Sequence, residues 1–232
     1  MTFQDLSQKD KEKLIEKWRY VLVEDPFIEE DWYEPIFDEF EAQMREFGIE
    51  NVEIKFSGFY SQGDGASFTG DVTDNFLFFQ KNWEKIGKKQ QNWLDLDEIK
   101  TRIDPDFDFL VQTGVTGKER FKIPIGDLVI SIQRTSSGNH FHEFTISSHV
   151  EWYEEVWPEE EPSKENVNRV NRGIENLEQQ ITDWAREKSR ILYRELEKYY
   201  EKITSEEAVV EWLEENFTPD FLYNIDSSST EL

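Results

Sequence analysis

One long run of apolar residues at helical spacing constrains the fold of this chain more than any other feature. Its members follow one another at intervals of three and four residues: Val167, Val170, Ile174, Leu177, Ile181 and Trp184. After a shift, the pattern resumes with Leu192, Leu196, Tyr199 and Ile203. Such spacing predicts one amphipathic helix over about 164–201. We expect its apolar face to pack within the chain, with pairing to a partner's helix as the alternative.

Shorter patterns predict the elements that this helix would cover. Expected helices lie at about 7–25, with Ser7 as the capping residue, at about 31–47 and, after Thr204 and Glu207 as a capping box, at about 204–216. Alternating apolar and polar residues predict strands at 51–60, 67–72, 127–134 and 140–150. Within the mixed segment 73–126, only residues 95–103 read as helical. The fold class is therefore α+β, an antiparallel sheet of two or more hairpins packed by N-terminal helices and a long C-terminal helix.

The composition supports a folded core in one domain. The 232 residues are 37% hydrophobic and 15% aromatic, and aromatic rings bring large apolar area per residue. We expect a single domain over 1–232, helical over 1–50, mostly sheet over 51–150 and helical over 163–216, with a frayed tail at 226–232. Because there is no cysteine, disulfide scaffolds and cysteine nucleophiles are excluded.

Targeting and membrane signals are missing from the sequence as given. The first residues have no apolar run behind their charges, and no stretch approaches eighteen consecutive apolar residues. We therefore expect a cytoplasmic protein that does not bind membranes.

Negative charge is large and segregated along the chain. The formal net charge is −25, which disfavours direct contact with nucleic acid or anionic lipid and favours a basic protein partner. Residues 24–50 hold eleven Asp and Glu against one Arg, residues 151–161 hold six Glu and no base, and residues 201–231 hold nine acids against one Lys. Outside these three segments the chain is almost neutral.

This distribution predicts an acidic binding surface. On the helix expected over 31–47, acidic residues recur at three- and four-residue spacing and so share a face. The carboxylates assigned to this surface are Glu34, Asp38, Glu39, Glu41, Glu154 and Glu155. Carboxylates so spaced approach the charge spacing of DNA, so a nucleic-acid-binding protein is the expected partner. The alternative is an acidic face that only keeps the chain soluble.

A glycine-rich hairpin is a second candidate site. The segment SGFYSQGDGASFTG, residues 57–70, joins two expected strands, and its free backbone N–H groups can hold an anion. It lacks the lysine of a phosphate loop and precedes a strand instead of a helix. A tight structural turn is the alternative. The residues assigned to a possible ligand loop here are Ser61, Gln62, Gly63, Asp64, Gly65 and Ser67.

Two histidines complete this candidate site. His140 and His142 are two residues apart, which on the expected strand 140–150 places both rings on one face. They could hold a ligand or do acid–base work, and structural histidines are the alternative. A third metal ligand is missing nearby, so we expect neither a metal nor a cofactor, and no catalytic motif supports an enzyme.

Several segments resemble proteins of tailed bacteriophages and prophages that carry the generic label "antitoxin of toxin–antitoxin stability system". The most specific segment is residues 57–68, SGFYSQGDGASF. The other matching segments are 31–33 through 47–49, 140–142, 192–197 and 203–208. The resemblance implies a phage origin and a location in the host cytoplasm, and it assigns no catalytic residue.

Three functions follow as hypotheses. The first is an acidic accessory protein that binds and inhibits a basic host protein, as an anti-defence inhibitor or an antitoxin does. The second is a nucleotide- or ligand-binding protein or enzyme that uses the glycine-rich hairpin and the histidine pair. The third is a structural component of a virion or its assembly. The sequence leaves the identity of the partner and the oligomeric state open.

Overall fold

The computed structural model describes residues 1–24, 32–97, 99, 123–135, 140–152 and 164–221. Contacts divide the chain into two compact units, one of residues 1–37 with 194–232 and one of residues 38–193. The boundaries fall within helix α3 (Glu34–Arg45) and helix α7 (Lys164–Ile203). The expectation of a single domain stays a prediction.

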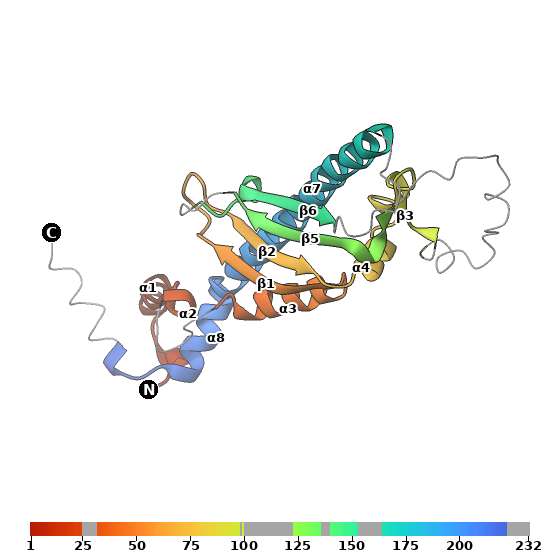
Figure 1. Ribbon diagram of the computed structural model, residues 1–232. Helices are drawn as coiled ribbons and strands as arrows, with labels where there is room; N and C mark the ends of the chain where they lie inside the picture. The colour runs from red at the N-terminus through yellow and green to blue at the C-terminus, as the bar shows by residue number, and fades with distance from the viewer. Residues whose placement is uncertain (25–31, 98, 100–122, 136–139, 153–163, 222–232) are drawn as a thin grey trace. The chain divides into compact units, whose positions relative to one another are not determined.

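A four-stranded antiparallel sheet forms the centre of unit 38–193 (Figure 1). Its strands are β1 (Ile49–Phe56), β2 (Ala66–Val72), β5 (Leu128–Arg134) and β6 (Ile146–Trp152), in the order β1-β2-β5-β6. The strands pair as two hairpins joined through β2 and β5, where Gly70 lies opposite Ile132. A short parallel pair, β3 (Leu94–Asp95) with β4 (Ile123–Pro124), lies outside this sheet.

The two faces of the sheet differ in polarity. On one face, Phe68 packs edge-on against Phe40 of α3 with ring centroids 5.1 Å apart. At the end of β1, Phe56 approaches Tyr193 of α7, with ring centroids 6.5 Å apart. The opposite face carries polar side chains: Glu53, Lys55, Thr69, Asp71, Ser131, Gln133, His149 and Glu151. One buried and one polar face is the usual state of an antiparallel sheet.

A helix missed by sequence reasoning completes the core on the helical side. Helix α4 (Asn75–Lys81) begins at Asp74, whose carboxylate accepts from the backbone N–H of Leu77 at 2.9 Å. Its Phe78 and Phe79 are fully buried, and the Phe78 ring lies 5.4 Å from that of Trp184 on α7. The mixed segment therefore does contribute to the core.

Unit 1–37 with 194–232 is helical. Helix α1 (Gln8–Trp18) begins at Ser7, whose hydroxyl accepts from the N–H of Asp10, as the sequence predicts. It packs against α8 (Glu206–Asn216), and short elements η1 (Phe3–Asp5) and α2 (Val21–Glu24) flank it. The buried residues of this cluster are Phe3, Leu14, Ile15, Val209 and Leu213.

The α+β class, the antiparallel sheet and the long C-terminal helix are confirmed. The N-cap of the last helix is corrected, because the Ser205 hydroxyl accepts from the N–H of Ala208 while Thr204 donates to the carbonyl of Tyr200. The predicted helix over 95–103 is helical at residues 97 and 99, whereas its first residue pairs in β3; residues 98 and 100–103 lie outside the described part. No helix in the described part of the chain has the length and hydropathy needed to cross a membrane.

Candidate functional site

Helix α3 presents carboxylates away from the sheet. Pro35 lies in its first turn, where a missing N–H costs nothing, and Phe40 and Met44 are buried. Helical spacing then places Glu34 and Asp38 on the other side of the helix. Glu34, Asp38 and Glu39 are exposed, and Glu41 is half-buried. Glu34, Asp38 and Glu41 share one side of the helix, and Glu39 lies on the flank opposite Glu41. We call these four carboxylates together the α3 acidic face.

The α3 acidic face is not neutralised by ion pairs. Among the residues that the structure describes, none of its four carboxylates has a Lys, Arg or His nitrogen within 4.0 Å. Gln43 donates one hydrogen bond to Glu39 at 3.3 Å. Carboxylates elsewhere do pair, as Glu187 does with Lys85 at 2.9 Å. The negative charge of α3 is therefore available to a partner.

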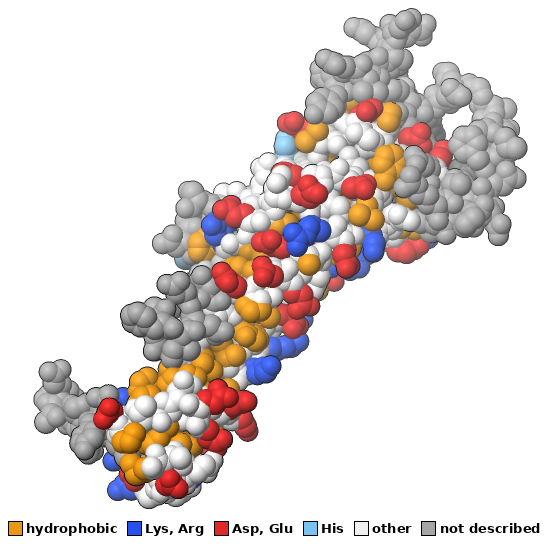
Figure 2. All heavy atoms as spheres, turned by 90° about the horizontal axis from the view of Figure 1, so that it is seen from below, with side chains coloured by type: hydrophobic (Ala, Val, Ile, Leu, Met, Phe, Trp, Pro, Cys, Tyr) orange, Lys and Arg blue, Asp and Glu red, His pale blue; other side chains and the backbone are white. Residues whose placement is uncertain are grey.

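Figure 2 views the molecule from the side on which α3 lies in Figure 1. It shows Asp and Glu side chains spread over this face, with a smaller number of Lys and Arg side chains among them. Glu154 and Glu155, the other carboxylates predicted for the binding surface, lie outside the described residues. At the edge of that second acidic segment, Glu151 is bonded to His149 at 2.7 Å.

The glycine-rich hairpin and the histidine pair line one hollow, although about 80 residues separate them in sequence. This hollow, which we call the Gly–His hollow, is open to solvent and measures about 620 Å³. Its lining residues are Gln62, Gly63, Asp64, His140, His142, Glu143 and Phe144. The structure thus brings together five of the residues that the sequence singles out for ligand binding.

The hairpin turn is held by Asp64. Its carboxylate accepts from the N–H groups of Tyr60 and Ser61 at 2.9 and 2.6 Å. Gly63 has a φ of +98°, a conformation that L side chains rarely adopt. At Gly65, an added Cβ would come within 2.6 Å of the Cα of His142, so glycine lets the two segments meet. The backbone N–H groups nearest the carboxylate are already engaged by it.

The histidines do not lie on a strand, which corrects the sequence-based expectation. β6 begins only at Ile146, and residues 143–145 form the short helix η4 (Glu143–Thr145). Nδ1 of His142 accepts from the N–H of Phe144 at 3.2 Å, which leaves Nε2 to carry the proton of the neutral ring. The two imidazole centroids are 6.5 Å apart. His142 can therefore donate to a ligand through Nε2.

Three predicted loop residues do not line the hollow. Ser67 is fully buried in β2, Gly65 is buried beneath His142, and Ser61 is exposed and gives its N–H to Asp64. Conversely, sequence reasoning missed Glu143, because a strand would direct it to the opposite face from the histidines. Within the described part, no three His, Asp or Glu side chains gather as a metal site requires.

These observations define an α+β protein in which α3 and α7 cover one face of a four-stranded antiparallel sheet, with an acidic helix face and an open Gly–His hollow. A family model described as a domain of unknown function, DUF8835, matches residues 32–206, and the chain belongs to that family. The match includes α3 and both segments of the Gly–His hollow. No curated protein and no solved structure matches the chain.

Proposed function

We propose that this chain is an acidic accessory protein that binds a basic, nucleic-acid-binding protein and occupies its nucleic-acid site. The observation that carries the proposal is the α3 acidic face, whose carboxylates have no ion-pair partner among the described residues. Exposed carboxylates without internal partners attract a positively charged surface and speed association at low salt.

The spacing of the carboxylates supports the comparison with nucleic acid. A helix rises about 1.5 Å per residue, so Glu34, Asp38 and Glu41, which share one side of α3, span about 10 Å of helix axis. One strand of duplex DNA carries a phosphate every 3.4 Å or so of axis, or roughly three over the same distance. The linear charge density of the α3 acidic face is therefore similar to that of one DNA strand.

The resemblance to proteins of tailed bacteriophages supplies the biological setting of the proposal. A phage-encoded protein of this kind acts in the host cytoplasm, where it blocks a host defence protein or neutralises a toxin. A protein of either kind that binds nucleic acid presents Lys and Arg to the phosphates, and this is the chemistry that the α3 acidic face complements.

The test compares two variants of equal charge in capture from bacterial lysate. The α3-neutral variant combines Glu34→Gln, Asp38→Asn, Glu39→Gln and Glu41→Gln. The matched control, the scattered-neutral variant, changes four exposed helical carboxylates elsewhere: Glu12→Gln, Glu165→Gln, Glu175→Gln and Glu197→Gln. Both variants remove four negative charges, so only the position of the lost charge differs.

We expect a partner that the wild-type chain and the scattered-neutral variant retain at low salt and that the α3-neutral variant loses. High salt should release this partner, and added duplex DNA should compete for it. A partner that binds all three chains equally, or that binds DNA and this chain at the same time, would refute nucleic-acid mimicry by α3.

The Gly–His hollow favours a second candidate function, the binding of a small ligand, because the fold gathers its predicted residues in one place. A nucleotide that binds there would raise the melting temperature of the wild-type chain. His142→Gln should reduce that rise, because the substitution changes the donor at Nε2. If ATP gives no rise, or an equal rise in the variant, this second function is rejected.

A further inference from the structure

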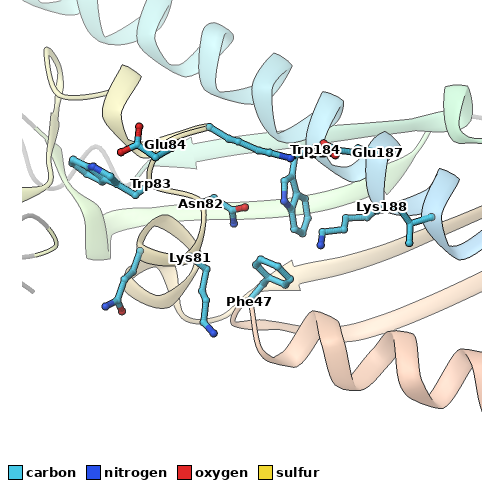
Figure 3. Close-up of a pocket in the computed structure, with 11 residues that line it drawn as sticks. Phe47, Lys81, Asn82, Trp83, Glu84, Trp184, Glu187 and Lys188 are labelled. Carbon is cyan, nitrogen blue, oxygen red and sulfur yellow. Dashed lines mark hydrogen bonds and ion pairs between the residues drawn. The ribbon is translucent and has the colours of Figure 1, made fainter. Parts of the chain in front are cut away.

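A second hollow lies between the end of α4 and helix α7, within unit 38–193. We call it the α4–α7 hollow, and it measures about 520 Å³, a size suited to a small organic ligand. One wall is the end of α4 and the turn that follows it, with Lys81, Trp83 and Lys85, and the other is α7. Figure 3 shows these walls, with Phe47 at one side.

Lys188 is one of three lysines that line this hollow. It extends from α7 toward the rings of Phe47 and Trp184 (Figure 3), and its Nζ lies 4.3 and 5.6 Å from their centroids. An ammonium over aromatic faces gains cation–π attraction but still lacks a counter-ion. No Asp or Glu oxygen of the described residues lies within 4.0 Å of it.

The carboxylate adjacent in sequence, Glu187, makes no direct ion pair with Lys188. Glu187 is bound by Lys85, whose Nζ lies 3.1 and 2.9 Å from its two carboxylate oxygens. Burial lowers the pKa of Lys188, repulsion from Lys85 adds to the effect, and the charge of Glu187 opposes it. A half-buried ammonium without a counter-ion is stabilised when an anion binds beside it.

The charge of this hollow is opposite in sign to that of the chain. Its lining holds three Lys against two Glu, in a protein whose formal net charge is −25. Apolar surface also borders the hollow, since Phe47 and Trp83 are half-buried and Ile191 is 41% exposed. A cation beside apolar walls fits a ligand with an anionic head and an apolar body.

We infer that the α4–α7 hollow binds a small organic anion, whose phosphate or carboxylate group accepts from the ammonium of Lys188 while its apolar body packs against Phe47 and Ile191. This site is separate from the α3 acidic face. It offers positive charge to an anion, whereas the α3 acidic face offers negative charge to a basic protein. It gives the chain an anionic ligand in addition to the basic protein proposed above.

The test is calorimetric titration of the whole chain with phenyl phosphate, which carries both an anionic head and an apolar ring. Inorganic phosphate and benzyl alcohol each supply one of these parts. We expect phenyl phosphate to bind more tightly than either. Lys188→Met keeps the apolar stem but removes the charge, and should weaken phenyl phosphate binding about tenfold or more, as loss of a hydrogen bond to a charged group does.

Two controls make the result specific. Lys89→Met removes an exposed lysine that does not line the hollow, and it should bind phenyl phosphate as the wild type does. Lys188→Gln is a second variant that keeps a polar end, for use if the methionine variant does not fold. Binding should also raise the pKa of Lys188 in an NMR titration, because the anion stabilises the charged amine.

The inference is overturned if phenyl phosphate does not bind, if the Lys188 variants bind it as tightly as the wild type, or if Lys89→Met weakens it equally. It is also overturned if benzyl alcohol binds as tightly as phenyl phosphate, because the anionic head would then contribute nothing.

Discussion

At the scale of single residues, Gly173 shows how packing overrides helix propensity. Glycine in the middle of a helix is less favourable than alanine by about 1 kcal/mol. Gly173 nevertheless lies within α7, where an added Cβ would come within 2.5 Å of the ring of Trp93. Trp93 is buried and its indole N–H donates to Gln90 at 2.9 Å, so the ring is fixed in place. The glycine allows the helix to pack directly on the indole.

Gly173→Ala should therefore destabilise the protein despite its higher helix propensity. Overpacking of a filled core costs about 1–3 kcal/mol, which exceeds the gain in propensity. Urea unfolding measures the difference. Asn168→Ala, at an exposed position of the same helix, is the control and should be neutral or slightly stabilising. A Gly173→Ala protein more stable than the wild type would contradict the contact with Trp93.

His149 gives a prediction for pH dependence. A hydrogen bond with Glu151 raises the pKa of His149 from its ordinary value of 6.5, and the charge of Glu178 adds to the effect. Because the folded-state pKa is higher than the unfolded one, this histidine stabilises the fold fully below about pH 6.5. The contribution is lost as pH rises through the folded-state pKa.

An NMR titration of the imidazole resonances tests this assignment. We expect the pKa of His149 to lie above 6.5 in the wild type and to fall in Glu151→Gln. The control is the isosteric Glu50→Gln, which changes a carboxylate on β1. Gln133→Glu would not serve as a control, because it adds a charge on the face of the sheet that carries His149. An unchanged His149 pKa in Glu151→Gln would show that Glu151 is not the cause.

At the scale of elements, helix α7 protects the edge of the sheet in addition to covering its face. The hydroxyl of Thr182 accepts from the N–H of Ser148 at 2.9 Å, and the carboxylate of Glu178 accepts from the N–H of Val150 at 2.9 Å. Both donors belong to edge strand β6, whose other neighbour is β5. When helix side chains accept hydrogen bonds from the free N–H groups of an edge strand, that strand cannot use them to pair with another chain.

Thr182→Val tests this role, because it keeps the shape of the side chain and removes the acceptor. Leaving the N–H of Ser148 without its partner should cost about 1–3 kcal/mol of unfolding free energy. Thr182→Ser retains the hydroxyl and should lose less stability. A valine variant as stable as the wild type would mean that this hydrogen bond contributes nothing to the edge.

The sequence allows prediction of elements whose pattern is long and unbroken. Helix α7 keeps one apolar stripe over most of its length, so its period identifies it, and Ser7 caps α1 as predicted. The region of His140 and His142 was harder, because an i, i+2 pair fits a strand as well as the turn into η4. Likewise, adjacent Thr204 and Ser205 are both acceptable N-caps, and only the backbone geometry selects Ser205.

The candidate sites also differ in how far they can be predicted from the sequence. The α3 acidic face was predictable, because its carboxylates lie within one helix and its spacing is local. The α4–α7 hollow was not, because Lys85 and Lys188 are about 100 residues apart and α4 itself was not recognised. The sequence indicated the members of the Gly–His hollow, but only the folded chain shows that they line one surface.

At the scale of the whole molecule, excess negative charge is the dominant property. A formal net charge of −25 favours solubility, but the excess carboxylates repel one another in the folded state. Salt screens this repulsion, with a Debye length of about 10 Å at 0.1 M. The α3 acidic face adds to the repulsion because it has no ion-pair partner among the described residues.

The melting temperature should therefore rise as sodium chloride is added from low to moderate concentration. The rise should be smaller in the α3-neutral variant, because four of the mutually repelling charges are removed. Differential scanning calorimetry provides the measurement. A melting temperature that falls or stays constant with salt in the wild type would indicate that its charges are compensated within the fold.

The most direct test of the central claim is the dissociation constant of the captured partner, measured over a series of salt concentrations for the wild-type chain and both charge variants. If the α3 acidic face replaces nucleic acid, the constant rises steeply with salt for the wild type and the scattered-neutral variant. The α3-neutral variant should bind more weakly and with a shallower dependence on salt. Equal affinities and equal salt dependence for all three chains would contradict the account.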